Sequence, residues 1–159
     1  MFPQLLLALG LSASLLSLTM ATNSSTLPAF LVISVVDSAG VTLGSLTGYG
    51  NFSHPGPSYP FRSAASTTSA DHASSLHGYH SCNAAVGGIL ACSDSLTASS
   101  FSSVNGNLVL EGTDGTWSVA AKDDSSVGTD PLGHVIGIPV HVGSTAAIPV
   151  TLSIKATTG

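Results

Sequence analysis

Apolar and polar residues alternate most regularly near the end of the chain. Over 147–155 every second residue is a large apolar one: Ile148, Val150, Leu152 and Ile154. A second alternating run, 136–142, precedes it and is separated from it by residues 143–146. Alternation with period two is typical of a half-buried β-strand, so the two runs predict a hairpin. Pro139 and Pro149 lack the N–H that a strand donates, so at least one strand should lie at a sheet edge or carry a bulge.

Shorter runs of the same kind predict further strands upstream. They lie at 30–37, 41–46, 87–92, 99–103, 107–111 and 116–121. Asn105-Gly106 and Asp114-Gly115 are strong turn signals between them, and no window carries the apolar stripe of a helix. The stretch 48–80 is rich in Ser, Ala, Pro and His and predicts one long irregular excursion. We therefore predict a single all-β domain, an antiparallel β-sandwich or barrel of about eight short strands.

The start of the chain predicts export. The first 36 residues carry no charged side chain, and an apolar run from Leu5 to Leu18 ends near a small-residue cleavage site at Ala21. The run is shorter than the roughly 20 apolar residues of a membrane-spanning helix, although an uncleaved anchor and a core segment remain alternatives. We predict a signal peptide at 1–21, an exposed tail at 22–28 and one domain at 29–159. The mature protein is expected outside the cell, without membrane contact.

The number and spacing of the charged residues limit the kinds of molecule that the protein is expected to bind. The chain has 3 basic and 8 acidic residues, and its formal net charge is −5. Arg62, Lys122 and Lys155 are scattered singly along the sequence, so no basic patch for nucleic acid is encoded. Hydrophobic residues make up 43% of the chain, which argues against disorder. The sequence does not indicate an oligomeric state.

Two cysteines, Cys82 and Cys92, are expected to pair in an oxidising compartment. Gly87-Gly88 lies near the middle of the segment between them and allows the chain to turn back. A redox role would favour the closer spacing Cys-x-x-Cys, which is absent. The cysteines therefore predict a structural disulfide.

Three histidines, His72, His77 and His80, gather in the irregular stretch beside Asp71. Imidazoles are ligands for zinc and copper, so these are the candidate metal ligands. Their spacings of five and three fit neither a strand face nor a helical i, i+4 pair, which favours ordinary loop histidines. No Gly-x-Ser-x-Gly elbow marks a hydrolase. We expect no cofactor and no catalytic residue; the alternative is a small secreted hydrolase or metal-dependent enzyme that uses the histidine loop.

Asn23-Ser24-Ser25 and Asn51-Phe52-Ser53 match the acceptor pattern for N-linked glycans. The first follows the predicted cleavage site, and the second lies at the start of the irregular stretch. Both positions suit surface acceptors in an exported protein. We therefore predict glycosylation at Asn23 and Asn51.

One segment, 82–121, carries a family resemblance. Cys82-x9-Cys92 is followed by Phe101, by Gly106-Asn107-Leu108 and by Trp117. This order is similar to that of the small secreted fungal proteins grouped around the cell-wall protein PhiA and IgE-binding antigens, although the chain lacks the later cysteines of that family. The resemblance implies a secreted, wall-associated, non-catalytic β-sandwich, and it provides no catalytic residue to carry over.

Exposed aromatic side chains are typical of sugar-binding sites. The candidates all lie between residues 48 and 80: Tyr49, Phe52, Tyr59, Phe61 and Tyr79. The alternative is that these rings cap the core, as we expect of Trp117, which shares a strand face with Val119. The sequence thus predicts a secreted, non-enzymatic extracellular or cell-wall-associated protein. Its expected partner is wall polysaccharide or an extracellular protein, bound weakly.

Overall fold

The computed structural model describes residues 23–54, 56–66, 72–123, 128–133 and 136–158. Every regular element in these ranges is a β-strand, which confirms the all-β prediction. The strands are β1 (Ser24–Ser25), β2 (Phe30–Asp37), β3 (Thr42–Leu46), β4 (Phe52–Ser53), β5 (Phe61–Ala65), β6 (Ser74–His77), β7 (Cys82–Asn83), β8 (Ala91–Cys92), β9 (Ser100–Val104), β10 (Asn107–Leu110), β11 (Trp117–Val119), β12 (Val140–Val142) and β13 (Ile148–Ala156). The described residues include no helix with the length and hydropathy needed to cross a membrane.

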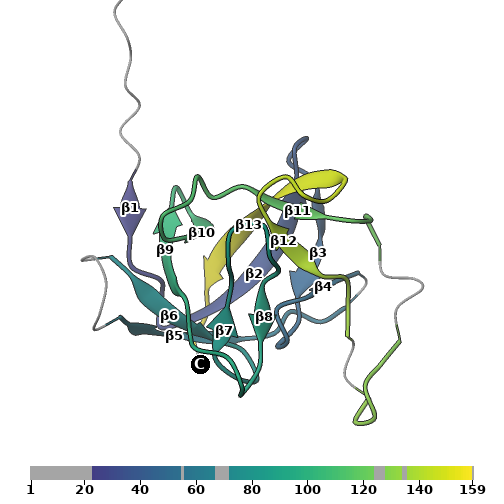
Figure 1. Cartoon of the computed structure of the whole chain (residues 1–159), viewed down its shortest axis with the longest axis horizontal. Coiled ribbons are helices and arrows are strands. Elements are labelled where there is room, and N and C mark those ends of the chain that lie inside the picture. Colours follow the sequence, from purple (N-terminus) through teal and green to yellow (C-terminus); the bar gives the residue numbers. More distant parts are fainter. Residues whose placement is uncertain (1–22, 55, 67–71, 124–127, 134–135, 159) are drawn as a thin grey trace, which may run out of the picture.

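Six of the strands close into an antiparallel barrel (Figure 1). The ring runs β2–β5–β6–β9–β10–β13, and β13 pairs with β2 to complete it. Strands β3 and β4 extend the sheet from β2, and β11 and β12 extend it from β13. Because a closed ring pairs every strand on both sides, the barrel strands present no long free edge to another chain.

The β2–β13 pair forms the longest seam of the barrel. Its register runs from Leu31 opposite Ala156 to Asp37 opposite Val150. The side chains predicted to share one face of β2 are fully or almost fully buried: Leu31, Ile33 and Val35. Burying these branched side chains against the opposite wall of the barrel supplies the main driving force for closure.

Trp117 lies in the core, as predicted. Its indole is 1% exposed, and the Nε1–H donates a hydrogen bond of 2.9 Å to the carbonyl oxygen of Leu108. Val119, on the same face of β11, is also buried. The hydrogen bond satisfies the one polar atom of a side chain that otherwise contacts apolar neighbours.

The stretch 48–80 is more regular than its sequence indicates. It contains β4, and its β5–β6 hairpin supplies two walls of the barrel. The alternation is faint because each of these two strands buries a single large apolar residue, Phe61 or Leu76. The neighbouring inward position in β6 is Ser74, whose hydroxyl accepts a hydrogen bond from the Leu27 N–H. A serine satisfied in this way can occupy a core position that a pattern of apolar residues does not reveal.

The predicted hairpin between the last two strands is wrong. Strand β11 lies between β12 and β13 and pairs with both. The turn after β12 is held by a hydrogen bond from the Gly143 N–H to the Thr116 carbonyl oxygen, which directs the chain around β11. Strand β12 is therefore at one end of the strand order, with Pro139 directly before it, and residues 88–90 cover its outer side through hydrogen bonds with Val140 and Val142.

The described part of the N-terminal segment belongs to the fold. Strand β1 pairs with β9, with Ser24 opposite Val104, and Leu27 is only 6% exposed. Within the predicted exposed tail at 22–28, Ser24, Ser25 and Thr26 are exposed to solvent, while the backbone of Ser24 and Ser25 pairs with β9 and Leu27 is buried. The predicted signal peptide at 1–21 lies outside the described residues.

Candidate functional site

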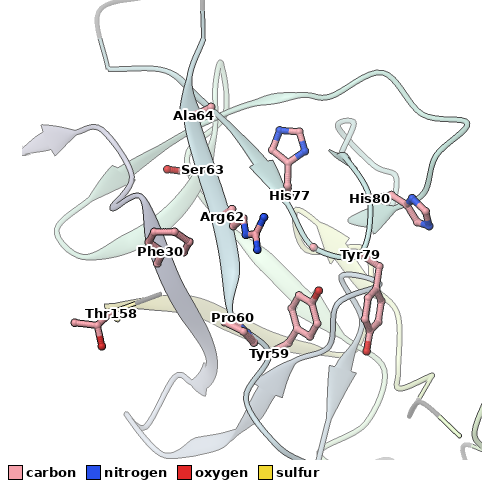
Figure 2. A pocket seen from close by; sticks show the side chains of 11 residues that line it. Phe30, Tyr59, Pro60, Arg62, Ser63, Ala64, His77, Tyr79, His80 and Thr158 are labelled. Atoms are coloured by element: carbon pink, nitrogen blue, oxygen red, sulfur yellow. The ribbon is translucent and has the colours of Figure 1, made fainter.

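A groove of about 800 Å³ lies along the β5–β6 hairpin (Figure 2). Strand β5 and the segment before it contribute Tyr59 and Arg62, and the end of β6 and the following turn contribute His77, Tyr79 and His80. Phe30 at the start of β2 lines the other side. The groove is therefore built on the two strands that the sequence did not predict.

Three tyrosine rings contact one another in one cluster: Tyr59 and Tyr79 line the groove, and Tyr49 packs on Tyr79 from a neighbouring hollow. The rings of Tyr59 and Tyr79 have centroids 4.6 Å apart, and those of Tyr49 and Tyr79 are 4.8 Å apart. Both pairs are tilted by about 60°, an orientation that aromatic quadrupoles favour over a face-to-face sandwich. Tyr79, in the middle, is 38% exposed and so presents part of its ring to solvent.

Two glycines allow this arrangement by close approach. A Cβ atom on Gly48 would lie 2.6 Å from the Tyr79 ring, and one on Gly78 would lie 2.2 Å from the Gly48 carbonyl oxygen. That same carbonyl oxygen accepts a 2.8 Å hydrogen bond from the Tyr79 N–H. The loop after β3 and the turn after β6 thus meet backbone to backbone, which fixes the position of the Tyr79 ring.

Asp130 holds the outer end of the tyrosine cluster. The hydroxyl of Tyr49 donates a hydrogen bond to the Asp130 carboxylate. This bond and partial burial raise the pKa of the Tyr49 hydroxyl above its ordinary value, because the carboxylate favours the protonated phenol. Burial raises the pKa of Tyr79 as well, with added effects from Tyr59 and Asp130. Tyr49 and Tyr79 therefore keep their protons to a higher pH than an ordinary tyrosine does.

For Phe52 and Phe61 the predicted sugar contact is wrong. Both side chains have no exposed surface and belong to the core of the barrel. Phe61 supports the site from beneath, since its ring meets Tyr59 edge to face at 5.4 Å. Of the five candidate aromatics, the three tyrosines contact one another, two of them lining the groove, and the two phenylalanines lie in the core.

Positive charge lines the same groove. Arg62 lies directly opposite His77 across the β5–β6 pair, and its exposed guanidinium has no described carboxylate within ion-pairing distance. The ring nitrogens of His77 lie 3.2 Å from the Ser75 hydroxyl and 3.3 Å from the Ser81 hydroxyl, which hold its orientation. No aspartate or glutamate is among the described residues that line the groove.

The three candidate metal ligands are placed separately. His72 and His80 are exposed at different points of the chain, and His77 is half-buried between two serines. In the part of the chain that the structure describes, no three His, Cys, Asp or Glu side chains are arranged to hold a metal ion. Asp71 and His134 lie outside that part.

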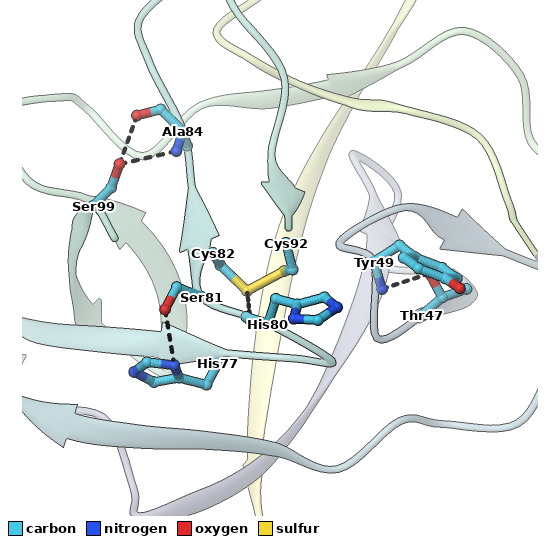
Figure 3. The surroundings of a disulfide bond; sticks show 9 residues. All are labelled: Thr47, Tyr49, His77, His80, Ser81, Cys82, Ala84, Cys92 and Ser99. Atoms are coloured by element: carbon cyan, nitrogen blue, oxygen red, sulfur yellow. Dashed lines mark hydrogen bonds between the residues drawn. A yellow bond between two sulfur atoms is a disulfide. The ribbon is translucent and has the colours of Figure 1, made fainter. Parts of the chain in front are cut away.

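The predicted disulfide between Cys82 and Cys92 is confirmed, and it lies beside the site (Figure 3). It joins β7 to β8 at directly opposite positions. The Cys92 N–H donates a 2.8 Å hydrogen bond to the Tyr49 carbonyl oxygen, and the His80 carbonyl oxygen lies 3.9 Å from the Cys82 sulfur. The crosslink therefore connects the two segments that carry Tyr49 and His80.

The two predicted glycosylation sites have different surroundings. Asn23 is exposed. The Asn51 side-chain amide donates a 2.8 Å hydrogen bond to the Ile136 carbonyl oxygen, and Ser53 of the same sequon is 2% exposed. A glycan is therefore easier to accommodate at Asn23 than at Asn51.

Arg62 and Asp130 are the site residues that sequence reasoning missed. Arg62 has no other basic residue near it in the sequence. It comes to lie beside His77 only through the pairing of β5 with β6. Its position between the aromatic residues Tyr59 and Phe61 and a serine-rich stretch was the available signal. The chain matches no protein-family model, no curated protein and no solved structure.

Proposed function

We propose that this chain is a secreted, non-enzymatic protein of the cell exterior that binds wall polysaccharide through the groove beside β5 and β6. The observation that carries the proposal is the tyrosine cluster at a groove of about 800 Å³. Sugar rings present flat C–H faces that pack on aromatic rings, while their hydroxyls bond to polar groups at the rim. Tyr79 provides the partly exposed ring, and His77 and His80 provide polar atoms beside it.

The extracellular location is supported by the charge-free leader, the disulfide and the two sequons. A disulfide that closes a short loop persists in an oxidising compartment. Membership of the PhiA-like fungal wall proteins stays a prediction based on residues 82–121. The location is tested by intact-mass analysis of the secreted protein: we expect the loss of residues 1–21, the two-hydrogen deficit of a disulfide, and hexose additions. A protein found only inside the cell, with residues 1–21 intact, would contradict it.

Retention on insoluble polysaccharide tests the binding proposal. The purified protein is mixed with insoluble β-glucan or chitin, and the fraction that sediments is measured. We expect Tyr79→Ala to lose most of the retention and Tyr79→Phe to keep it, because phenylalanine preserves the ring face. Val86→Ala is the matched control, since Val86 is 80% exposed and does not line the groove.

Two outcomes would contradict the proposal. One is a wild-type protein that remains in solution with every polysaccharide tested. The other is equal retention of Tyr79→Ala and wild type, with both folded by circular dichroism. Retention only when other exported proteins are present would instead support the alternative predicted partner, an extracellular protein.

A further inference from the structure

Arg62 is placed to receive an anion. Its guanidinium extends from β5 into the groove, and the rings of His77, Tyr59 and Tyr79 surround the same hollow (Figure 2). No described carboxylate is close enough to form an ion pair with it; among the described residues, the ion pair formed is that of Lys122 with Asp37. A guanidinium offers a planar fork of N–H donors that matches a carboxylate.

Two histidines lie beside Arg62 in the groove. His77 faces Arg62 across the hairpin, and its ring nitrogens lie within hydrogen-bond distance of the Ser75 and Ser81 hydroxyls. His80 lies at the far end of the groove beside Tyr79. Each imidazole can donate a ring N–H to an oxygen atom of a bound ligand, so the two histidines add polar contacts around the Arg62 guanidinium.

No described negative side chain in the groove neutralises the positive charge of Arg62. No described carboxylate lines the groove, and burial raises the pKa of Tyr79, which favours the uncharged phenol there. Asp130 acts on Tyr79, but it is bonded to the Tyr49 hydroxyl and lines a different hollow. The groove is therefore a basic spot on a chain whose formal net charge is −5, and the field of such a spot attracts anions selectively.

We propose that the groove binds acidic saccharide, with a uronic acid carboxylate on the Arg62 guanidinium and a sugar face on the Tyr79 ring. This inference rests on the proposed polysaccharide binding and names the class of sugar. The tyrosine rings favour a saccharide over an acidic peptide, because a peptide carboxylate needs the cation alone whereas a uronic acid also uses the flat ring. The overall negative charge disfavours nucleic acid, whose binding requires many cations.

The test compares three oligosaccharides of equal length by isothermal titration calorimetry. They are an oligogalacturonate, the same oligomer with its carboxylates methyl-esterified, and a neutral gluco-oligosaccharide. At pH 5 and low salt we expect the oligogalacturonate to bind at least about tenfold more tightly than its methyl ester, the change expected when hydrogen bonds to a charged group are lost. Its affinity should fall with added salt, because salt screens the attraction between the carboxylate and the guanidinium.

Arg62→Gln and Lys122→Gln form a matched pair. Each removes one positive charge, but Lys122 pairs with Asp37 and does not line the groove. We expect Arg62→Gln to lose about tenfold in affinity for oligogalacturonate and Lys122→Gln to change it little. Thermal unfolding of both variants checks that the barrel is intact.

The possible failures are distinguishable. Equal binding of the acid, its methyl ester and the neutral oligomer would overturn the preference for acidic sugar and leave the proposed polysaccharide binding in place. Absence of binding to all three oligomers and to the insoluble polysaccharides would overturn both. Oligoglutamate that binds as tightly as oligogalacturonate, or equal losses in the two variants, would overturn the assignment of a uronic acid to Arg62 and Tyr79.

Discussion

The hydroxyl of Tyr49 donates a hydrogen bond to the carboxylate of Asp130, 81 residues further along the chain. Tyr49 lies in the loop after β3, and Asp130 lies between β11 and β12. All three tyrosines of the chain belong to the cluster that this bond anchors. Tyrosinate absorbance therefore reports on the candidate site alone, without a background from other tyrosines.

We expect Asp130→Asn to lower the pKa of Tyr49 toward its ordinary value. Tyr49 has a raised pKa in the folded state, so its contribution to stability is complete below about pH 10 and is lost as the pH rises through the folded-state value. The variant should thus ionise earlier in an alkaline absorbance titration and lose less stability over the same range. Asp94→Asn is the control, because Asp94 is exposed and its side-chain partner is Ser93; identical titration curves for the two variants would contradict the role of Asp130.

Gly48→Ala should displace the Tyr79 ring. The added Cβ would lie 2.6 Å from two atoms of that ring and 2.9 Å from the Tyr59 ring, closer than side-chain contacts allow, so the packing of the two rings must change. We expect a changed near-ultraviolet circular dichroism spectrum and reduced retention on polysaccharide. Gly128→Ala, where an added Cβ meets nothing within 4 Å, should match the wild type in both measurements. A normal spectrum for Gly48→Ala would show that the loop tolerates the methyl group.

Trp117→Phe should destabilise the fold by about 1–3 kcal/mol, because it leaves the buried Leu108 carbonyl oxygen without the indole N–H. The smaller ring also leaves space in a well-packed core. Urea unfolding followed by far-ultraviolet circular dichroism measures the change, since the variant has no tryptophan fluorescence. Leu132→Ala, at a position 80% exposed, should stay within about 0.5 kcal/mol of the wild type. An equal, small effect of both substitutions would contradict the assigned hydrogen bond.

Asp37 should make the free energy of unfolding depend on pH in the acidic range. Hydrogen bonds from the Val41 and Ala39 N–H groups hold the pKa of its carboxyl below the ordinary value, with a further contribution from Lys122. Its contribution to stability is therefore present above about pH 4 and is lost as the pH falls through the folded-state value. We expect Asp37→Asn to reduce the loss in urea midpoint between pH 6 and pH 2.5. Lys122→Gln should alter it less, because Lys122 is 62% exposed and surface pairs contribute little.

Much of the barrel could be predicted from local signals. The alternation over 30–37 predicted both ends of β2 correctly. Asn105-Gly106, with positive φ angles of 51° and 78°, forms the tight turn between β9 and β10 that its sequence indicates. The two cysteines, with Gly87-Gly88 between them, predicted the disulfide that joins β7 to β8, whereas the strand predicted at 87–92 is limited to Ala91–Cys92 because Gly87 turns the chain. In each case the residue type itself carries the geometry, so no distant contact was needed.

The groove and the partners of the last strands could not be predicted in this way. Strands β5 and β6 are rich in serine and alanine, and the serine that points into the core accepts a hydrogen bond from a distant N–H. The alternation of apolar and polar residues that marks a strand is therefore nearly absent from them. The insertion of β11 between β12 and β13 depends on contacts far apart in the sequence. The meeting of Tyr49, Tyr59 and Tyr79 depends equally on the folded loops, so the sequence could place these rings in one region but not at one point.

The pairing of β2 with β13 has a consequence for the order of folding. Ser34 in β2 lies opposite Ser153 in β13, so the barrel cannot close until β13 has been synthesised. Contacts of such long sequence separation carry a large loop-closure cost and are associated with slow folding. Strand β13 is the last barrel strand in the sequence. The ring therefore stays open while its other five strands emerge, and the seam with β2 completes it last.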